Sequence, residues 1–392
     1  MAKLLIASLV DPATHPGGAG TYTRGLVAAL QRRGHAVDLV APLHAPPGSW
    51  YRPRQLISLA RSCISELPAK VLFTRQHEFK ERIVETARSG GYDAALVNSG
   101  DMGWAIDALP REMPTVLIAL NLEHEVLRQQ LANSLLLSRI FKQEIVKQRR
   151  YEIECFRRVG GVIFLSTTDM AWAYSHVPGL QALYVPPLFT ELRIPRNRGP
   201  SAHLRLGFLA DFAWWPNRRN WDWLINEILP NVRRPIAVHV FGRQSERIPT
   251  CEGVVVHGPV RELRAVWDQV DIMICPVRTG AGVNIKLAES LYNGMPVLAT
   301  THAARGLDCQ SGAGLAIVDG AEEWASFLSS PQADRLATQS PSEELSGQFA
   351  ADRHAKKLED FIFKRVIGRE TMNCEVPDPT RLQKYSNQTG CS

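Results

Sequence analysis

Short apolar runs alternate with amphipathic stretches along most of the chain, a rhythm typical of a parallel α/β protein. In the first half, apolar runs bounded by turn residues predict strands at residues 3–10, 36–41, 92–98 and 114–120. In the second half, similar runs predict strands at residues 204–209, 236–242, 254–257, 272–276 and 296–300. Most of the intervening segments place apolar residues at helical spacing. We therefore expect an α/β fold with two Rossmann-like domains, each built on a parallel sheet.

The length of 392 residues suffices for two domains of ordinary size, each with its own core. A stretch rich in proline, arginine and glycine near residues 190–202 predicts the boundary between them. We expect a first domain at residues 1–195, a second at 203–345, a last helix within 346–368 and a polar tail at 369–392.

The composition is that of a globular protein, with 45% hydrophobic and 21% charged residues. The seven cysteines include no C-x-x-C pair, which argues against a zinc ribbon or a disulfide scaffold and suggests reduced thiols in a cytosol. The apolar N-terminal run leads straight into Asp11 and Pro12, so we expect a core strand there and no signal peptide. No window approaches a transmembrane helix. The net charge of +6 would suit an acidic donor, an anionic lipid surface or nucleic acid equally.

The stretch from Gly280 to Thr300 predicts a glycine loop, a helix and a strand, following an apolar strand at 272–276. Amide groups at Gly280 to Val283, together with the positive end of the helix, would suit a phosphate. Lys286 and Glu289 are three residues apart and share a helix face. A cation that binds phosphate, next to a carboxylate that accepts hydrogen bonds from sugar hydroxyls, suits a nucleotide-sugar donor. The alternative on spacing alone is a surface salt bridge beside a structural turn.

This segment resembles the donor-binding signature of the GT-B glycosyltransferases of family 4, G-x-G-x-x-x-K-x-x-E-A-x-x-x-G-x-P-V. The matching residues are Gly280, Gly282, Lys286, Glu289, Gly294, Pro296 and Val297. Ala281 stands where many members carry a second glutamate, which the subset resembled also lacks. A second segment resembles the W-x-P-N motif of the same subset, at Trp215, Pro216 and Asn217.

The resemblance implies a GT-B architecture, with two Rossmann-like domains facing across a cleft and the last helix crossing back to the first domain. It implies sugar transfer with retention of anomeric configuration. Glu289 would hold the ribose hydroxyls. The leaving diphosphate would be neutralised by Lys286, by Arg218 or Arg219, and by the amides of Gly280, Ala281, Gly282 and Val283.

In the first domain, Gly17 and Gly18 follow the first strand, and residues 33–35, Arg-Gly-His, match a further family turn near the cleft. In the family this glycine pair faces the donor phosphate and the acceptor, so the resemblance implies that Gly17 and Gly18 belong to the donor-binding residues. Their spacing is not the dinucleotide fingerprint, and a tight turn without a ligand is the alternative.

Polar residues follow the strand at 114–120. The segment with Asn121, Glu123 and His124 resembles a family element whose histidine touches the donor sugar, although Leu120 replaces the leading histidine. The role of that histidine would fall to His124, and a purely structural histidine is the alternative.

We therefore expect a retaining, hexosyltransferase-type glycosyltransferase that moves a sugar from a nucleotide-diphosphate donor to a hydroxyl acceptor in glycan, polysaccharide or glycolipid biosynthesis. The alternatives are a catalytically silent sugar-nucleotide-binding protein and a nucleotide-sugar epimerase. No cofactor is expected, and no D-x-D motif is present to bind a metal. The acceptor would be a carbohydrate, a lipid-linked sugar or a small molecule, with no nucleic-acid partner. Basic residues within 54–88 and 126–158 suit either a solvated face or peripheral contact with the inner face of a membrane.

Overall fold

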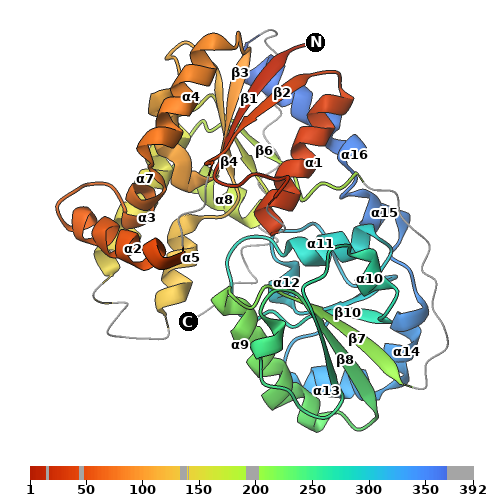
Figure 1. Ribbon diagram of the computed structural model, residues 1–392. Coiled ribbons are helices and arrows are strands. Elements are labelled where there is room, and N and C mark those ends of the chain that lie inside the picture. Colours follow the sequence, from red (N-terminus) through yellow and green to blue (C-terminus); the bar gives the residue numbers. More distant parts are fainter. Residues whose placement is uncertain (15–16, 44–47, 133–138, 140, 191–202, 369–392) are drawn as a thin grey trace. The chain divides into compact units, whose positions relative to one another are not determined.

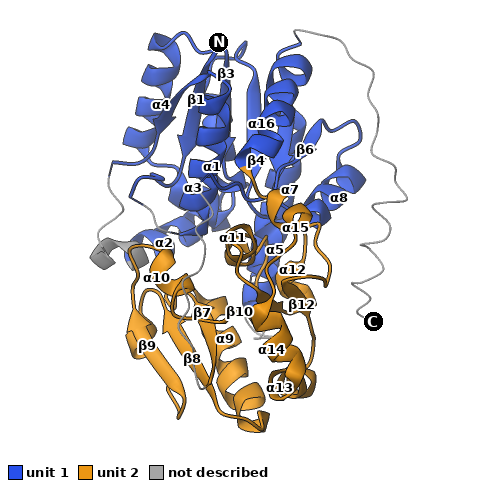
Figure 2. Cartoon of the chain, turned by 90° about the vertical axis from the view of Figure 1, so that its right-hand side faces the viewer, with its two compact units in different colours: residues 1–190, 351–392 blue, residues 191–350 orange. Residues whose placement is uncertain are grey.

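The computed structural model describes residues 1–14, 17–43, 48–132, 139, 141–190 and 203–368, with backbone only for 48–52. These residues form two units (Figure 2): a first unit of Met1–Thr190 with the chain from Ala351 onward, and a second unit of Glu191–Ala350. The polar tail predicted at 369–392 and most of the predicted linker lie outside the described residues.

The first unit contains a parallel six-stranded sheet (Figure 1). In sheet order its strands are β2 Ala36–Val40, β1 Lys3–Ser8, β3 Ala94–Asn98, β4 Thr115–Ala119, β5 Gly161–Phe164 and β6 Ala182–Tyr184. Every residue of β3, β4 and β5 is buried, because helices cover both faces of a parallel sheet. This explains why these strands read as continuous apolar runs. The strand order reverses direction between β1 and β3.

Helices follow the strands of the first unit in the expected alternation. They are α1 Gly18–Arg32, α2 Gly48–Cys63, α3 Ala69–Thr74, α4 His77–Ser89, a 3-10 helix Gly100–Ala108, α5 Glu123–Leu131, α7 Lys142–Arg158 and α8 Thr167–His176. Helix α1 begins at Gly18 directly after Gly17, so the glycine pair forms its start. Helix α5 begins at Glu123, so Glu123 and His124 lie in its first turn.

The second unit contains another parallel six-stranded sheet. In sheet order its strands are β12 Leu315–Ile317, β11 Val297–Ala299, β10 Ile272–Cys275, β7 Leu204–Leu209, β8 Ile236–Phe241 and β9 Val254–Gly258. The direction of strand order reverses between β7 and β10, which are neighbours with Met273 beside Gly207.

The helices of the second unit pack on this sheet. They are α9 Trp215–Trp223 with a π-helical turn Leu224–Ile228, α10 Arg264–Trp267, α11 Ile285–Tyr292, α12 Thr301–Ala304, α13 Ala321–Ser329, α14 Pro331–Thr338 and α15 Glu343–Gly347. Trp221 and Trp223 of α9 lie in the core together with Trp324 of α13.

The C-terminal helix belongs to the first unit. Helix α16, Ala351–Asp360, continues as a π-helical turn Phe361–Val366 and lies beside α1 in Figures 1 and 2. Arg32 pairs with Asp352 at 2.7 Å, and Glu359 accepts from Arg33 at 2.7 Å and lies 3.1 Å from Nε2 of His35. The Arg-Gly-His turn therefore fastens the C-terminal helix, at the opposite end of α1 from Gly17. Among the described helices, none has the length and apolar character that a membrane span requires.

Candidate functional site

The predicted donor-binding residues of the second unit gather at the reversal point of its sheet. After β7 the chain crosses to β8 on one side, and after β10 it crosses to β11 on the other side. The loops after β7 and β10 therefore lie side by side at the carboxyl edge, where open α/β sheets bind ligands. Arg218 and Arg219 lie on α9 after the first loop. Residues 280–283, Lys286 and Glu289 lie on the second loop and on α11.

The glycine loop, residues 278–284, has a backbone that only glycine adopts readily at two points. Gly280 has φ 129° and Gly282 has φ 78°. The buried side chain of Asn220 ties the start of this loop to α9, because its Oδ1 accepts from the amide of Arg278 at 3.0 Å. Its Nδ2 donates to the carbonyl of Thr279 at 3.4 Å. The loop is therefore held in one conformation by a residue of the neighbouring crossover.

The carbonyl groups of the glycine loop are bonded by the segment after β11. Nε2 of His302 donates to the carbonyl of Gly280 at 2.7 Å, and Arg305 donates to that of Gly282 at 3.3 Å. The amides of Ala281, Gly282 and Val283 form no hydrogen bond with any residue that the structure describes. Helix α11 begins directly after them, with Asn284 capping the amide of Leu287 at 3.4 Å. Donors without partners at a helix start form a site for an anion.

Lys286 adds a positive charge to this site. Its side chain is partly buried, and its Nζ makes no ion pair or hydrogen bond within the described part of the chain. Burial lowers the pKa of Lys286, against the opposing influence of Cys275, Asp211 and Glu289. It is also the only lysine in residues 203–350, where the other long basic side chains are all arginines. A desolvated cation without a counter-ion is costly in an empty site and is compensated when an anion binds.

Glu289 lies one turn after Lys286 on α11 and is partly buried. The negative charge of Glu289 raises the pKa of Lys286, so the two side chains are close enough to interact. Burial raises the pKa of the nearby Cys275 thiol to about 12, so this cysteine is neutral and serves as packing.

Arg218 and Arg219 occupy different positions. Arg218 donates to the carbonyls of Phe212 at 2.5 Å and Ala213 at 3.3 Å, and so fixes the loop after β7. Arg219 stacks over the indole of Trp215 at 5.7 Å and has no hydrogen-bond partner among the described residues. Of the two predicted arginines, Arg219 has the guanidinium that is available to a ligand.

A cavity of about 360 Å³ adjoins the glycine loop on the side of β11 and β12. Its lining includes Trp223, Arg278, Thr300, His302 and Asp319. None of the predicted donor-binding residues lines this cavity, but His302 belongs both to its wall and to the support of the loop. Sequence reasoning assigned no role to Asn220, His302 or Arg305. The sequence does place these three residues after predicted strands that end at one edge of the sheet, and this position is the signal that could have identified them.

In the first unit, the three predicted catalytic residues follow β4. Asn121 is partly buried, whereas Glu123 and His124 open α5 and are buried. Glu152 of α7 accepts from the amides of Glu123 at 2.6 Å and His124 at 3.1 Å, and lies 2.6 Å from Nδ1 of His124. The ring of His124 also packs against Trp172. Nε2 of His124 has no partner among the described residues, so one ring nitrogen is structural and the other is available.

Glu123 is part of an acidic cluster that we define as Asp101, Glu123 and Glu152 with Lys70. Lys70 pairs with Asp101 at 2.7 Å and also with Glu123. Burial raises the pKa of Asp101 to about 7, and the charge of Glu123 adds to this effect while Lys70 opposes it. Burial raises the pKa of Glu152 as well, against its bond from His124. Buried carboxyls with raised pKa values are typical of functional sites.

Gly17 and Gly18 lie after β1, at the reversal point of the first sheet. Gly17 caps α1 with an ordinary extended backbone, φ −79° and ψ 170°, so no positive φ explains the glycine. The described structure thus places Gly17 and Gly18 at one strand end and Asn121, Glu123 and His124 at another on the same carboxyl edge.

Replacing Asp101 by asparagine should flatten the pH dependence of stability. A carboxyl with a raised folded pKa stabilises the fold below its unfolded pKa of 3.8, and this contribution is lost as the pH rises through about 7. Between about pH 5 and about pH 8, the melting temperature of wild type should therefore fall more than that of Asp101→Asn. Asp107→Asn, an exposed carboxylate paired with Arg158, is the control and should follow wild type. Parallel losses in wild type and Asp101→Asn would contradict the prediction.

Part of the chain matches a known family, and its fold is similar to solved structures. Residues 203–330 match the profile of the family described as Glycosyl transferases group 1. The fold is similar to that of sucrose-phosphate synthase from Thermosynechococcus elongatus, with 15% identity, a TM-score of 0.68 and coverage of 92% of this chain and 98% of that one. Alr3699/HepE from Anabaena in complex with UDP-glucose is also similar, with 15% identity, a TM-score of 0.59 and coverage of 92% and 99%. No curated protein sequence matches the chain.

A third similar structure is TarM, at 9% identity and a TM-score of 0.53 over 100% of this chain and 99% of that one. At these identities the likeness concerns the fold, whereas the profile match concerns the segment that holds the glycine loop and α11. Residues 203–330 therefore belong to the glycosyl transferases group 1 family, GT4, and the chain as a whole has the GT-B fold of two Rossmann-like domains.

Proposed function

We propose that this protein is a retaining glycosyltransferase that moves a sugar from a nucleotide diphosphate to a hydroxyl acceptor. The observation that carries the proposal is the anion site at the reversal point of the second sheet. There, three amides without partners, the start of α11 and the unpaired cation of Lys286 belong to one short segment. A diphosphate is the group that such a site neutralises best.

The chemistry follows from the charges. As the bond between the sugar and the diphosphate breaks, negative charge develops on the leaving group. Donors that are already fixed in place lower the barrier, because they need no reorganisation at that moment. Asn220, His302 and Arg305 supply this rigidity by holding the backbone of the glycine loop. Lys286 and Arg219 supply charge, and Glu289, one turn deeper on α11, accepts from the ribose hydroxyls.

A nucleotide sugar is also the ligand class of a structural relative. The HepE structures contain UDP, UDP with glucose, or UDP-glucose. We therefore propose a UDP-hexose as the first donor to test. The first unit would hold the acceptor near Asn121, Glu123 and the available Nε2 of His124, with Gly17 and Gly18 leaving room beside them. The acceptor would be a carbohydrate, a lipid-linked sugar or a small molecule.

Thermal stabilisation by a panel of UDP-, GDP- and dTDP-sugars tests the donor site. The correct donor at 100 times its dissociation constant should stabilise the protein by about 2.7 kcal/mol. Glu289→Ala should remove most of this stabilisation, because the ribose hydroxyls lose their acceptor. Glu322→Ala, an exposed carboxylate of α13, should leave it unchanged. Equal donor affinity in Glu289→Ala and wild type would overturn the assignment.

Donor hydrolysis without acceptor separates the remaining classes of protein. A transferase slowly releases free sugar and nucleotide diphosphate, with water acting as a poor acceptor. A silent sugar-nucleotide-binding protein is stabilised by the donor but releases neither product. An epimerase converts the donor sugar into its epimer, and this would appear as a second nucleotide sugar on chromatography.

A further inference from the structure

Helix α2 exposes aliphatic residues and buries serines, which is the reverse of an ordinary surface helix. Its outward row contains Ile57, 57% exposed, and Ile64, 92% exposed, just after the last turn, and Leu56 beside this row is 67% exposed. The inward row contains Ser58 and Ser62, which are both buried. A surface helix normally buries its aliphatic residues and exposes its serines. We call Leu56, Ile57 and Ile64 the α2 face.

Positive charge accompanies the α2 face. Residues 48–64 contain three arginines and no acidic residue. Arg61 is exposed and makes no ion pair within the described residues, and the same holds for Lys142 at the start of α7. The next acidic residue along the chain, Glu66, is paired with Arg150 at 3.4 Å. Helix α2 therefore carries positive charge, including the unpaired Arg61, and no negative charge of its own.

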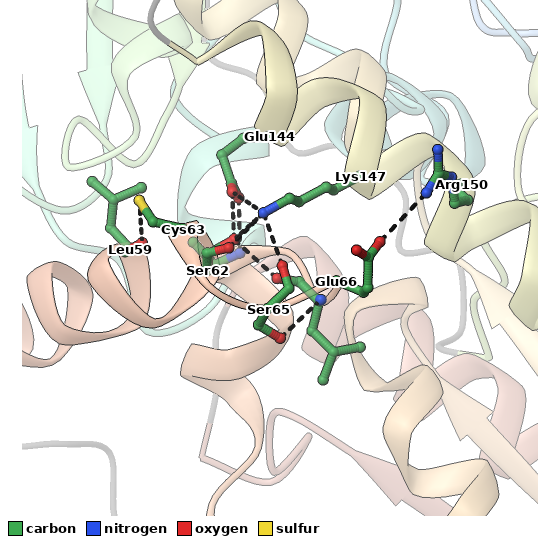
Figure 3. Close-up of polar contacts among 10 residues, drawn as sticks. Leu59, Ser62, Cys63, Ser65, Glu66, Glu144, Lys147 and Arg150 are labelled. Carbon is green, nitrogen blue, oxygen red and sulfur yellow. Dashed lines mark hydrogen bonds and ion pairs between the residues drawn. The ribbon is translucent and has the colours of Figure 1, made fainter.

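The polar contacts shown in Figure 3 fix the C-terminal end of α2 to α7. Lys147 donates to the carbonyl of Ser65 at 2.9 Å and to that of Ser62, which neutralises the negative end of the helix. Glu144 accepts from the amide of Ala69 at 2.9 Å and lies within hydrogen-bonding reach of the Ser62 hydroxyl. The outward direction of Ile57 and Ile64 thus results from a specific network that buries the serines and is not the fraying of a loose helix.

We propose that the α2 face docks this protein on a bilayer containing anionic phospholipids. Aliphatic side chains flanked by unpaired cations, with no acidic residue on the helix, are complementary to the boundary between acyl chains and acidic headgroups. A second protein copy would bring the same cations onto one another, which disfavours self-association through this face. The proposal does not depend on the assigned reaction, but docking would bring a lipid-linked acceptor to the first unit.

Co-sedimentation with vesicles tests the proposal. The full chain should bind vesicles of phosphatidylcholine with phosphatidylglycerol at low salt, and should bind phosphatidylcholine vesicles at least about tenfold more weakly. Raising NaCl to about 0.5 M should weaken the binding to the anionic vesicles, because the charges are screened. Ile57→Ser with Ile64→Ser should lower binding about tenfold, since both side chains lose their apolar insertion. Arg61→Gln with Lys142→Gln should lower binding to the anionic vesicles alone.

Val255→Ser is the matched control, an aliphatic residue 43% exposed on β9 of the second unit, and should bind as wild type does. All these positions are exposed, so the melting temperature and the donor hydrolysis rate should not change. Failure of wild type to bind anionic vesicles would overturn the proposal, as would undiminished binding by the double serine variant. A dimer that depends on Ile57 and Ile64, without vesicle binding, would assign the α2 face to self-association instead.

Discussion

Lys286→Met should lower the turnover of nucleotide sugar about a hundredfold to a thousandfold and at the same time raise the melting temperature. Loss of one preorganised charge at a developing anion has about this effect on the rate. The rise in stability has a separate cause. Lys286 is partly buried without a counter-ion in the described structure, and methionine fills a similar volume without the desolvation cost. Steady-state kinetics and a thermal melt of the two proteins measure the two effects.

The two readouts together separate a functional lysine from a structural one. If Lys286 were the cation of a surface salt bridge, its replacement would lower stability slightly and leave turnover unchanged. Arg247→Met removes an exposed cation from the same unit and should alter neither quantity. A less stable but fully active Lys286→Met would contradict the anion site.

Glu152→Ala should lower the free energy of unfolding by about 3 kcal/mol, the largest stability effect that we expect from one side chain in the first unit. The carboxylate of Glu152 accepts from two buried amides at the start of α5 and holds the ring of His124. Alanine leaves these three groups without an acceptor in a buried place. Chemical denaturation measures the change.

The control lies two residues along the same helix. Glu154 is exposed, so Glu154→Ala should change the free energy of unfolding by less than about 0.5 kcal/mol. Similar losses in the two variants would indicate that helix propensity dominates and that Glu152 does not organise the start of α5.

The sequence allowed the fold to be predicted because both sheets are parallel and covered on both faces. Residues 204–209, for example, were predicted as a strand and form β7 with the same limits. The helix of Lys286 and Glu289 was also predicted closely, since Asn284 and Gly294 are local start and stop signals. Local chemistry determines such features, so a single sequence reveals them.

The acidic cluster could not be predicted in the same way. Lys70, Asp101, Glu123 and Glu152 come from four separate segments, and only the packing of α3 and α7 beside the ends of β3 and β4 unites them. The same applies to His302 and Arg305, whose contacts with the glycine loop depend on strand order. The exposure of apolar residues on α2 could not be predicted either. Ser62 is buried by Glu144 and Lys147, which lie on α7, far along the chain.

The path of the chain has a consequence for synthesis. Residues 203–350 form one continuous stretch, whereas the first unit needs α16 and the π-helical turn after it to cover α1. A ribosome making this protein has therefore finished the later sheet before it has made the segment that closes the earlier one. Until then, the side of α1 that α16 covers stays exposed in the nascent N-terminal half. A chain stopped near residue 350 would keep that side exposed to chaperones and proteases.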